Sequence, residues 1–193
     1  MRFPAVIPVL ETKRIRIRPM QISDAPAMFS YMSDPAVSQY LTWYPHRSLD
    51  DTVRYTAMAT FTAQNGGVVE WVFENKNTKT VIGNGGFTSF DTRHVNAELS
   101  FLLSRDFWNK GIMTEVLNAL LAYGFHNGLH RIEAQCIPEN KVSQALLHKV
   151  GFHKEGVLRQ KMFIKRRFRD IIVYGMLKDD FCKHKEDNDE GDY

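Results

Sequence analysis

The stretch 96–126 changes its hydrophobic periodicity at a single glycine. Residues 96–103 form an apolar strand-like segment, and from Gly111 to about His126 apolar residues recur at the spacing of an amphipathic helix. Between them, residues 104–114 place several backbone N–H groups at a helix N-terminus, where no intrahelical carbonyl accepts them. Such groups bind phosphate, because the helix dipole lies behind them. The segment therefore predicts either an anion-binding loop or a plain strand-to-helix turn.

Length and composition fit one soluble domain. The chain has 193 residues, of which 44% are hydrophobic and 24% charged, as is usual for globular proteins. No apolar run approaches the roughly 20 residues that span a bilayer, and the first residues make a poor signal peptide. Neither the two cysteines (Cys136 and Cys182) nor the seven scattered histidines have metal-ligand spacing. We therefore expect a cytoplasmic protein with free thiols, no metal and no membrane contact.

Charge is distributed unevenly along the chain. The formal net charge is +3, yet residues 183–193 hold two lysines against five acidic residues. This composition predicts a domain over residues 1–181 and a disordered acidic tail over residues 182–193. The remaining, more basic body suits an acidic ligand such as a nucleotide phosphate, or an RNA-rich neighbourhood.

The order of the other elements predicts a single mixed α/β domain. Helices are expected after N-caps at Ser23, Asp34, Ser48 and Asn140, and again at Gly111. Gly66 and Gly67 are expected to end the third helix. Strands are expected at 14–20, 68–74, 81–90, 96–103, 131–137, 152–160 and 170–177, the last two around a basic loop at 161–169.

Five sequence blocks resemble the GNAT acyltransferase superfamily. They are Ala97–Leu99, Phe107–Glu115, His130–Ala134, Pro138–Ser143 and Gly151–Gly156, in the order and spacing of the family. The likeness extends from about residue 10 to residue 177, and it is greatest to the Rim-type ribosomal-protein N-terminal acetyltransferases that act on serine or alanine. The resemblance implies an α+β fold with a central, splayed, mixed and mostly antiparallel sheet flanked by helices. It also implies acetyl-CoA as co-substrate, wedged between two parallel strands.

The same resemblance implies a cofactor site. The positions that pair with the pantetheine arm are Phe101, Leu102 and Leu103. The positions on the pyrophosphate loop are Asn109, Lys110, Gly111, Ile112, Met113 and Thr114. Trp108 and Met113 stand where the family has Arg or Gln and a small residue. We therefore expect main-chain amides to carry the binding, with modest affinity, and Lys110 to add a point charge near the phosphates.

For catalysis the resemblance implies fewer residues. Asn140 and Ser143 match positions near the CoA arm and sulfur; Ser143 either hydrogen-bonds the departing sulfur or is an ordinary polar residue of a helix start. The Glu and Tyr of some N-terminal acetyltransferases fall on Gln135 and Leu147, which cannot accept or donate the proton. Glu98 is then the best candidate base, unless it is a structural carboxylate that orders a neighbouring loop.

The acceptor is expected to be a primary amine. An α-amino group has a pKa of about 7.7–8.0, against about 10.4 for lysine, so a peptide or protein N-terminus is favoured. Trp43, Tyr44 and Glu98 are the expected substrate-binding residues; the two aromatic rings either line the acceptor pocket or pack over the sheet. The basic loop 161–169 either contacts ribosomal RNA or an acidic substrate tail, or is a solvated hairpin. Two alternatives remain, a small-amine acetyltransferase (polyamine, amino acid or antibiotic) and a non-catalytic acyl-CoA-binding module. The protein is expected to be a monomer or homodimer that associates with the ribosome.

Overall fold

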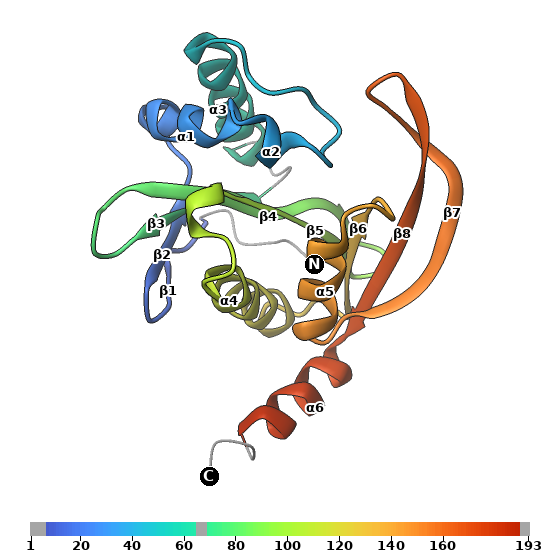
Figure 1. The fold of residues 1–193 in the computed structure, drawn as a ribbon. Helices are drawn as coiled ribbons and strands as arrows, with labels where there is room; N and C mark the ends of the chain where they lie inside the picture. Colours follow the sequence, from blue (N-terminus) through green and yellow to red (C-terminus); the bar gives the residue numbers. More distant parts are fainter. Residues whose placement is uncertain (1–6, 65–68, 190–193) are drawn as a thin grey trace.

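A single eight-stranded sheet runs through the molecule (Figure 1). The computed structural model describes residues 7–64 and 69–189. The strands lie in the order β1-β2-β3-β4-β5-β6-β8-β7, and every neighbouring pair is antiparallel except β5 and β6. Their bounds are β1 Leu10–Glu11, β2 Ile15–Pro19, β3 Val69–Asn75, β4 Val81–Asp91, β5 Asn96–Leu103, β6 Arg131–Cys136, β7 His153–Ile164 and β8 Arg167–Leu177.

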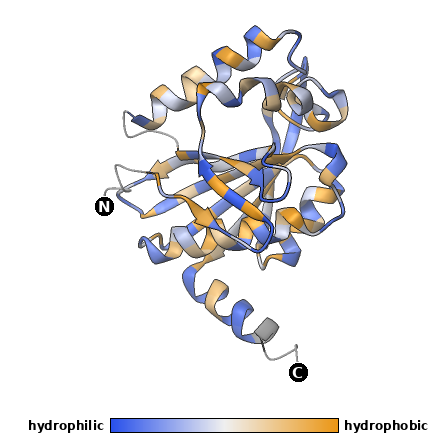
Figure 2. Ribbon diagram, turned by 90° about the vertical axis from the view of Figure 1, so that its left-hand side faces the viewer, coloured by the Kyte–Doolittle hydropathy of each residue, from blue (hydrophilic) through white to orange (hydrophobic). Residues whose placement is uncertain are grey.

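Helices cover both faces of this sheet (Figure 1). One face carries α1 (Ala25–Met32), α2 (Pro35–Ser38) and α3 (Leu49–Gln64), and the other carries α4 (Ile112–His126) and α5 (Lys141–Lys149). A last helix, α6 (Lys178–Asp189), follows β8 directly. Short 3-10 turns occupy Ile22–Asp24 and Arg105–Phe107. Hydrophobic and hydrophilic residues alternate along these elements (Figure 2), as elements with one buried face require.

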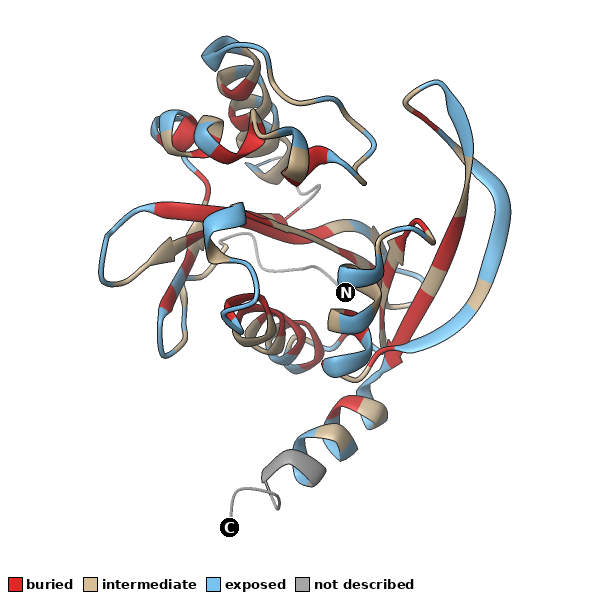
Figure 3. Cartoon of the chain, in the orientation of Figure 1, coloured by how far each residue is buried: buried red, intermediate tan, exposed pale blue. Residues whose placement is uncertain are grey.

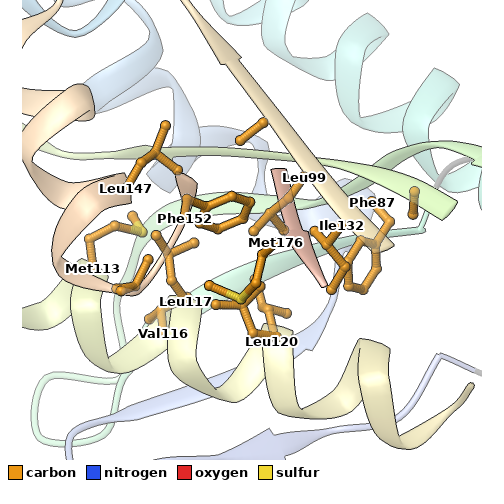
Figure 4. Packing of buried hydrophobic residues seen from close by; sticks show 14 of the residues in the cluster. Phe87, Leu99, Met113, Val116, Leu117, Leu120, Ile132, Leu147, Phe152 and Met176 are labelled. Carbon is orange, nitrogen blue, oxygen red and sulfur yellow. The ribbon is translucent and has the colours of Figure 1, made fainter. Parts of the chain in front are cut away.

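The main hydrophobic core lies between the sheet and α4 (Figure 4). All six residues of the predicted apolar stripe of this helix are buried: Met113, Val116, Leu117, Leu120, Leu121 and Phe125. They meet inward-facing strand residues such as Phe87, Leu99 and Ile132. This packing anchors α4, so that its N-terminus is held at the end of β5.

The sheet splays between β5 and β6. The two strands pair in parallel only over Asn96–Glu98 and Arg131–Glu133. β5 then continues to Leu103 against β4 alone, so its other edge has no strand partner beyond Glu98 among the described residues. The prediction of a splayed, mostly antiparallel sheet with one parallel wedge is confirmed.

Two local predictions differ from the structure at their ends. The helix expected after Ser23 begins after Asp24 instead, because the Asp24 carboxylate turns back to accept the Gln21 backbone N–H at 2.8 Å. The basic segment 161–169 is mostly strand rather than loop, since Phe163 pairs with Phe168 across the hairpin. Only Lys165 and Arg166 form its turn, both with positive φ. β7 is exposed along most of its length (Figure 3).

The chain end is also more ordered than its composition predicts. Residues 182–189, which were expected to be disordered, continue α6. Two local features favour the helix: Asp180 accepts the Leu177 backbone N–H at 3.1 Å, and the Phe181 ring lies 5.3 Å from that of Phe125. Acidic residues in a first turn also suit the helix dipole. Gly66, Gly67 and residues 190–193 lie outside the described residues.

Candidate active site

The loop before α4 is shaped by two left-handed residues. Asn109 has a φ of 57° and Gly111, the N-cap of α4, a φ of 70°. A side-chain carbon built on Gly111 would meet only Arg14, at 3.6 Å, so glycine is needed here for its backbone conformation rather than for space. Ile112 and Met113 are buried in the core. The loop therefore offers main-chain amides, not these side chains, to an anion.

A carboxylate in the first turn of α4 connects this loop to the turn between β1 and β2. Glu115 accepts hydrogen bonds from Thr12 Oγ1 at 2.5 Å, from Arg14 backbone N–H at 2.7 Å and from Arg14 Nε at 2.6 Å. Arg14 Nη1 also donates to the Lys110 carbonyl at 2.7 Å. Although partial burial opposes it, these hydrogen bonds lower the pKa of Glu115. Sequence analysis missed this clamp, because its partners lie about a hundred residues apart.

The two departures from the family pattern have structural roles. Trp108 Nε1 donates to the Leu103 carbonyl at 2.8 Å, which fastens the loop to the end of β5. Met113 fills the core under α4. Lys110 lies with its ammonium 5.5 Å from the centre of the Phe107 ring, and its backbone carbonyl is the part held by Arg14.

The expected pantetheine strand and the start of α5 flank the opening in the sheet. Phe101 and Leu102 are partly buried and Leu103 is buried, on the strand whose edge is unpaired beyond Glu98. At α5, Asn140 Oδ1 accepts the Ser143 backbone N–H at 3.0 Å, so the side chain of Asn140 acts as a helix cap. The described residues give the Ser143 hydroxyl no hydrogen bond, and it is half-buried.

A cleft of about 320 Å³ opens on the α1–α3 side of the splayed strands. Its walls combine the segment after α2, one face of the sheet and the β7–β8 hairpin. The residues lining it are Tyr40, Leu41, Thr42, Trp43, Tyr55, Glu70, Asn84, Gly85, Thr88, Glu98, Ser100, Phe101, Leu102, Gln135, Cys136, Ile137, Met162, Ile164 and Ile171. Of the sequence-predicted residues, Glu98, Trp43, Phe101 and Leu102 thus line the cleft. Tyr44 lies outside the cleft, with the centre of its ring 5.7 Å from Lys165 Nζ. Asn140 and Ser143 also lie outside the cleft.

Glu98 is the carboxylate at the point where the sheet opens. It is half-buried, and Gln135 Nε2 approaches its Oε2 at 3.4 Å. Burial raises the pKa of Glu98, and the neighbouring Glu133 carboxylate raises it further. A carboxylate shifted toward neutral pH is a better proton acceptor than an ordinary one.

A second carboxylate of the cleft was not identified from the sequence. Glu70 Oε1 accepts hydrogen bonds from Tyr55 Oη and from Asn84 Nδ2. Asn84 Oδ1 accepts in turn from Tyr31 Oη at 3.0 Å. The only signal in the sequence is the polar position at Glu70 inside an otherwise apolar strand.

Other chemistry has little support in the described residues. Burial raises the pKa of the Cys136 thiol to about 11, so this cysteine stays protonated at neutral pH and is a weak nucleophile. In the part of the chain that the structure describes, no three His, Cys, Asp or Glu side chains gather as metal ligands. None of the helices described there is long and apolar enough to cross a membrane.

Comparisons with known proteins agree with this arrangement. A family profile described as "Acetyltransferase (GNAT) domain" matches residues 14–153. The chain is 34% identical over 174 residues to the uncharacterized N-acetyltransferase p20 of Bacillus licheniformis, covering 90% of this chain and 98% of that protein. It is 30% identical over 105 residues to the ribosomal protein uS5-alanine N-acetyltransferase of Escherichia coli, covering 53% and 54%.

Two solved structures with bound coenzyme share the fold. RimL, a ribosomal L7/L12 α-N-protein acetyltransferase in complex with coenzyme A, has a TM-score of 0.78 at 22% identity, covering 89% of this chain and 97% of that one. The microcin C7 self-immunity acetyltransferase MccE, in complex with acetyl-CoA and AMP, also has a TM-score of 0.78 at 22% identity, covering 86% and 93%.

The parallel wedge, the amide-rich loop at α4 and the cleft beside it are the features of an acetyltransferase of the GNAT class. The chain belongs to the GNAT family, and it is an N-acetyltransferase.

Proposed function

We propose that this enzyme acetylates the N-terminal α-amine of a peptide or protein by direct attack on acetyl-CoA. The observation that carries the proposal is the position of Glu98, whose half-buried carboxylate lines the cleft where β5 leaves β6. An acceptor amine in the cleft thus lies near a base, Glu98, on the same strand that is expected to hold the pantetheine arm. Similarity to the uS5-alanine enzyme and to RimL supports a ribosomal protein as target, which would place the enzyme in the cytoplasm.

The residues present fit acetyl-CoA. The free amides at the start of α4 and the glycine that permits their conformation suit a diphosphate. The unpaired edge of β5 beyond Glu98 offers backbone groups to the amides of the pantetheine arm, over Phe101, Leu102 and Leu103. Asn109 to Thr114 form the diphosphate loop in this proposal, with Lys110 as the adjacent cation.

The reaction requires two proton transfers. The amine nitrogen attacks the thioester carbonyl carbon, the carbon–sulfur bond breaks, and the sulfur leaves as a thiolate. Glu98 accepts the proton that the nitrogen loses. Ser143, at the start of α5, has a hydroxyl with no hydrogen-bond partner among the described residues, and it donates a hydrogen bond to the leaving sulfur, while Asn140 accepts from the Ser143 backbone N–H. The thiolate then takes up a proton from solvent.

A small-amine acceptor is the second candidate, and the size of the cleft favours it. A volume of about 320 Å³ is at the lower end for small-molecule pockets. Similarity to MccE, whose structure holds acetyl-CoA and AMP, is consistent with a small-molecule acceptor.

Release of free thiol from acetyl-CoA, measured with a panel of acceptors, tests the proposal. Peptides that begin with serine or alanine form one arm, and small primary amines form the other. Turnover on peptides is the expected result. Turnover on small amines alone would replace the proposed acceptor with the second candidate.

A further inference from the structure

The charged groups that line the cleft are all acidic. Among the described lining residues two are carboxylates, Glu70 and Glu98, and none carries a positive charge. A third acceptor is Gln135 Oε1, which is buried and has no hydrogen-bond partner among the described residues. A buried acceptor without a partner carries an energetic cost until a donor reaches it. This cleft therefore suits a ligand that is rich in N–H donors and positively charged.

The two carboxylates lie on one face of the sheet but two strands apart. Glu70 on β3 is opposite Gly86 on β4, which is opposite Ser100 on β5. Two strand spacings and the two-residue step from Ser100 to Glu98 separate their Cα atoms by about 12 Å. The two carboxyls are thus attached at separate positions along the cleft, so each can pair with a different charge.

Glu70 is held in place by groups that leave one of its oxygens free. Tyr55 and Asn84 both donate to Oε1, and the described residues supply no hydrogen bond to Oε2. Asn84 is itself fixed by Tyr31 from α1. The carboxylate is thus oriented by Tyr55 of α3 and by Asn84 of β4, which is how a binding group is preorganised.

From this geometry we infer that Glu70 forms a second cation-binding subsite, which selects acceptors that carry a positive charge several bonds away from the reacting amine. The acceptor class is an N-terminal peptide with a basic residue next to its first residue, or a long diamine. This inference rests on the proposed function, because it assumes that the reacting amine occupies the Glu98 end of the cleft.

The charge state of Glu70 is consistent with such a role. Burial raises the pKa of this carboxyl, and the hydrogen bonds from Tyr55 and Asn84 oppose that shift. A bound cation would favour the ionised form further.

Peptides that differ in one charge test the inference. We would measure kcat/KM for a serine-initiated peptide with lysine at the second position and for its norleucine counterpart, which has the same length but no charge. Cadaverine and pentylamine make the same comparison for small acceptors. In the native enzyme we expect the charged member of the pair to be preferred by about tenfold or more, the scale of one hydrogen bond to a charged group.

The variant E70Q should reduce this preference to less than about twofold, since glutamine can still accept from Tyr55 and Asn84 but has no charge. Its affinity for acetyl-CoA, measured by calorimetry, reports whether the protein is folded. The control E11Q removes an exposed carboxylate at the β1 edge, where Glu11 pairs with Lys76, and should keep the preference.

The outcomes separate the two levels of the argument. If peptides are acetylated but charge is not preferred, or if E70Q keeps the preference, the second subsite is disproved while the proposed function stands. If acetyl-CoA binds but no acceptor of either kind is acetylated, the proposed function fails and takes the subsite with it. If cadaverine is preferred over pentylamine but the two peptides are used equally well, the positive charge that Glu70 binds belongs to a small diamine.

Discussion

The two sides of the active site are built in different ways. In the proposed site, the cofactor side consists of backbone groups from one continuous stretch, residues 101–115, which runs from the end of β5 into α4. The acceptor side consists of side chains from the segment after α2, from α3, and from β3, β4, β5, β6, β7 and β8. The cofactor side needs one glycine and a helix start. The acceptor side needs the whole sheet to be in register.

This difference explains which side tolerates sequence change. A main-chain cradle survives substitutions such as Trp108 and Met113, because their side chains pack elsewhere. A cleft lined by Glu70, Glu98 and Gln135 loses charge when either glutamate is replaced by a neutral residue, and loses a hydrogen-bonding group when Gln135 is replaced. We therefore expect variants of the loop to alter affinity for acetyl-CoA, and variants of the cleft to alter turnover and acceptor choice.

The largest effect is expected from a negative charge placed in the cradle. G111D sets a carboxylate against the diphosphate, and should weaken CoA binding by roughly a hundredfold or more. G111N is the matched control, because asparagine has the same size and also tolerates a left-handed backbone. Calorimetric titration with CoA should show a much smaller loss for G111N. Equal affinities for the two variants would mean that phosphate does not bind at this loop.

Loss of the base is expected to be the next largest effect. E98Q should lower kcat by about a hundredfold, the usual scale for removal of a general base, while its affinity for CoA stays unchanged. The exposed pair of Glu139 with Arg169 offers a control, since E139Q removes a carboxylate that does not line the cleft. Near-native turnover of E98Q would make Glu98 structural and would leave water or another group as the proton acceptor.

The same contrast determines how much could be read from the sequence. The cradle and α4 were predictable, since strand, glycine and helix are contiguous and their periodicities are local. Glu98 and Trp43 entered the prediction through the family pattern, and the structure places both in the cleft. Glu70 was missed, because its place depends on the register of β3 with β4 and β5. The order of residues 182–189 was missed too, because composition does not reveal the packing of Phe181 on Phe125.

Loss of the hydrogen bonds from Arg14 to the loop before α4 should have a moderate effect, confined to cofactor binding. R14M removes the donor to the Lys110 carbonyl and the side-chain hydrogen bond to Glu115, whereas Thr12 and the Arg14 backbone N–H still donate to Glu115. We expect KM for acetyl-CoA to rise about tenfold, the scale of lost hydrogen bonds to a charged group, with a much smaller change in kcat. R16M is the control, because Arg16 lies two residues further along, on β2, but pairs with Glu11 instead.

A truncated substrate separates this positioning role from general destabilisation. Acetyl-pantetheine lacks the diphosphate, so its kinetic constants should not distinguish R14M from the native enzyme. An equal loss with both substrates would show that Arg14 stabilises the fold rather than the loop.

The smallest effect is expected in the pH dependence. Glu133 stands next to Glu98 in the parallel register and raises its pKa. Glu98 accepts a proton only when ionised, so activity should fall as the pH drops through that pKa. E133Q removes the repulsion, so the acid limb of the kcat/KM profile should move to lower pH. E155Q is the control, since Glu155 also pairs with Arg131 but does not shift Glu98. If the acid limb does not move in E133Q, it reports the titration of a group other than Glu98. The charges that line the cleft would then not control activity in the way expected from the comparison with the cofactor loop.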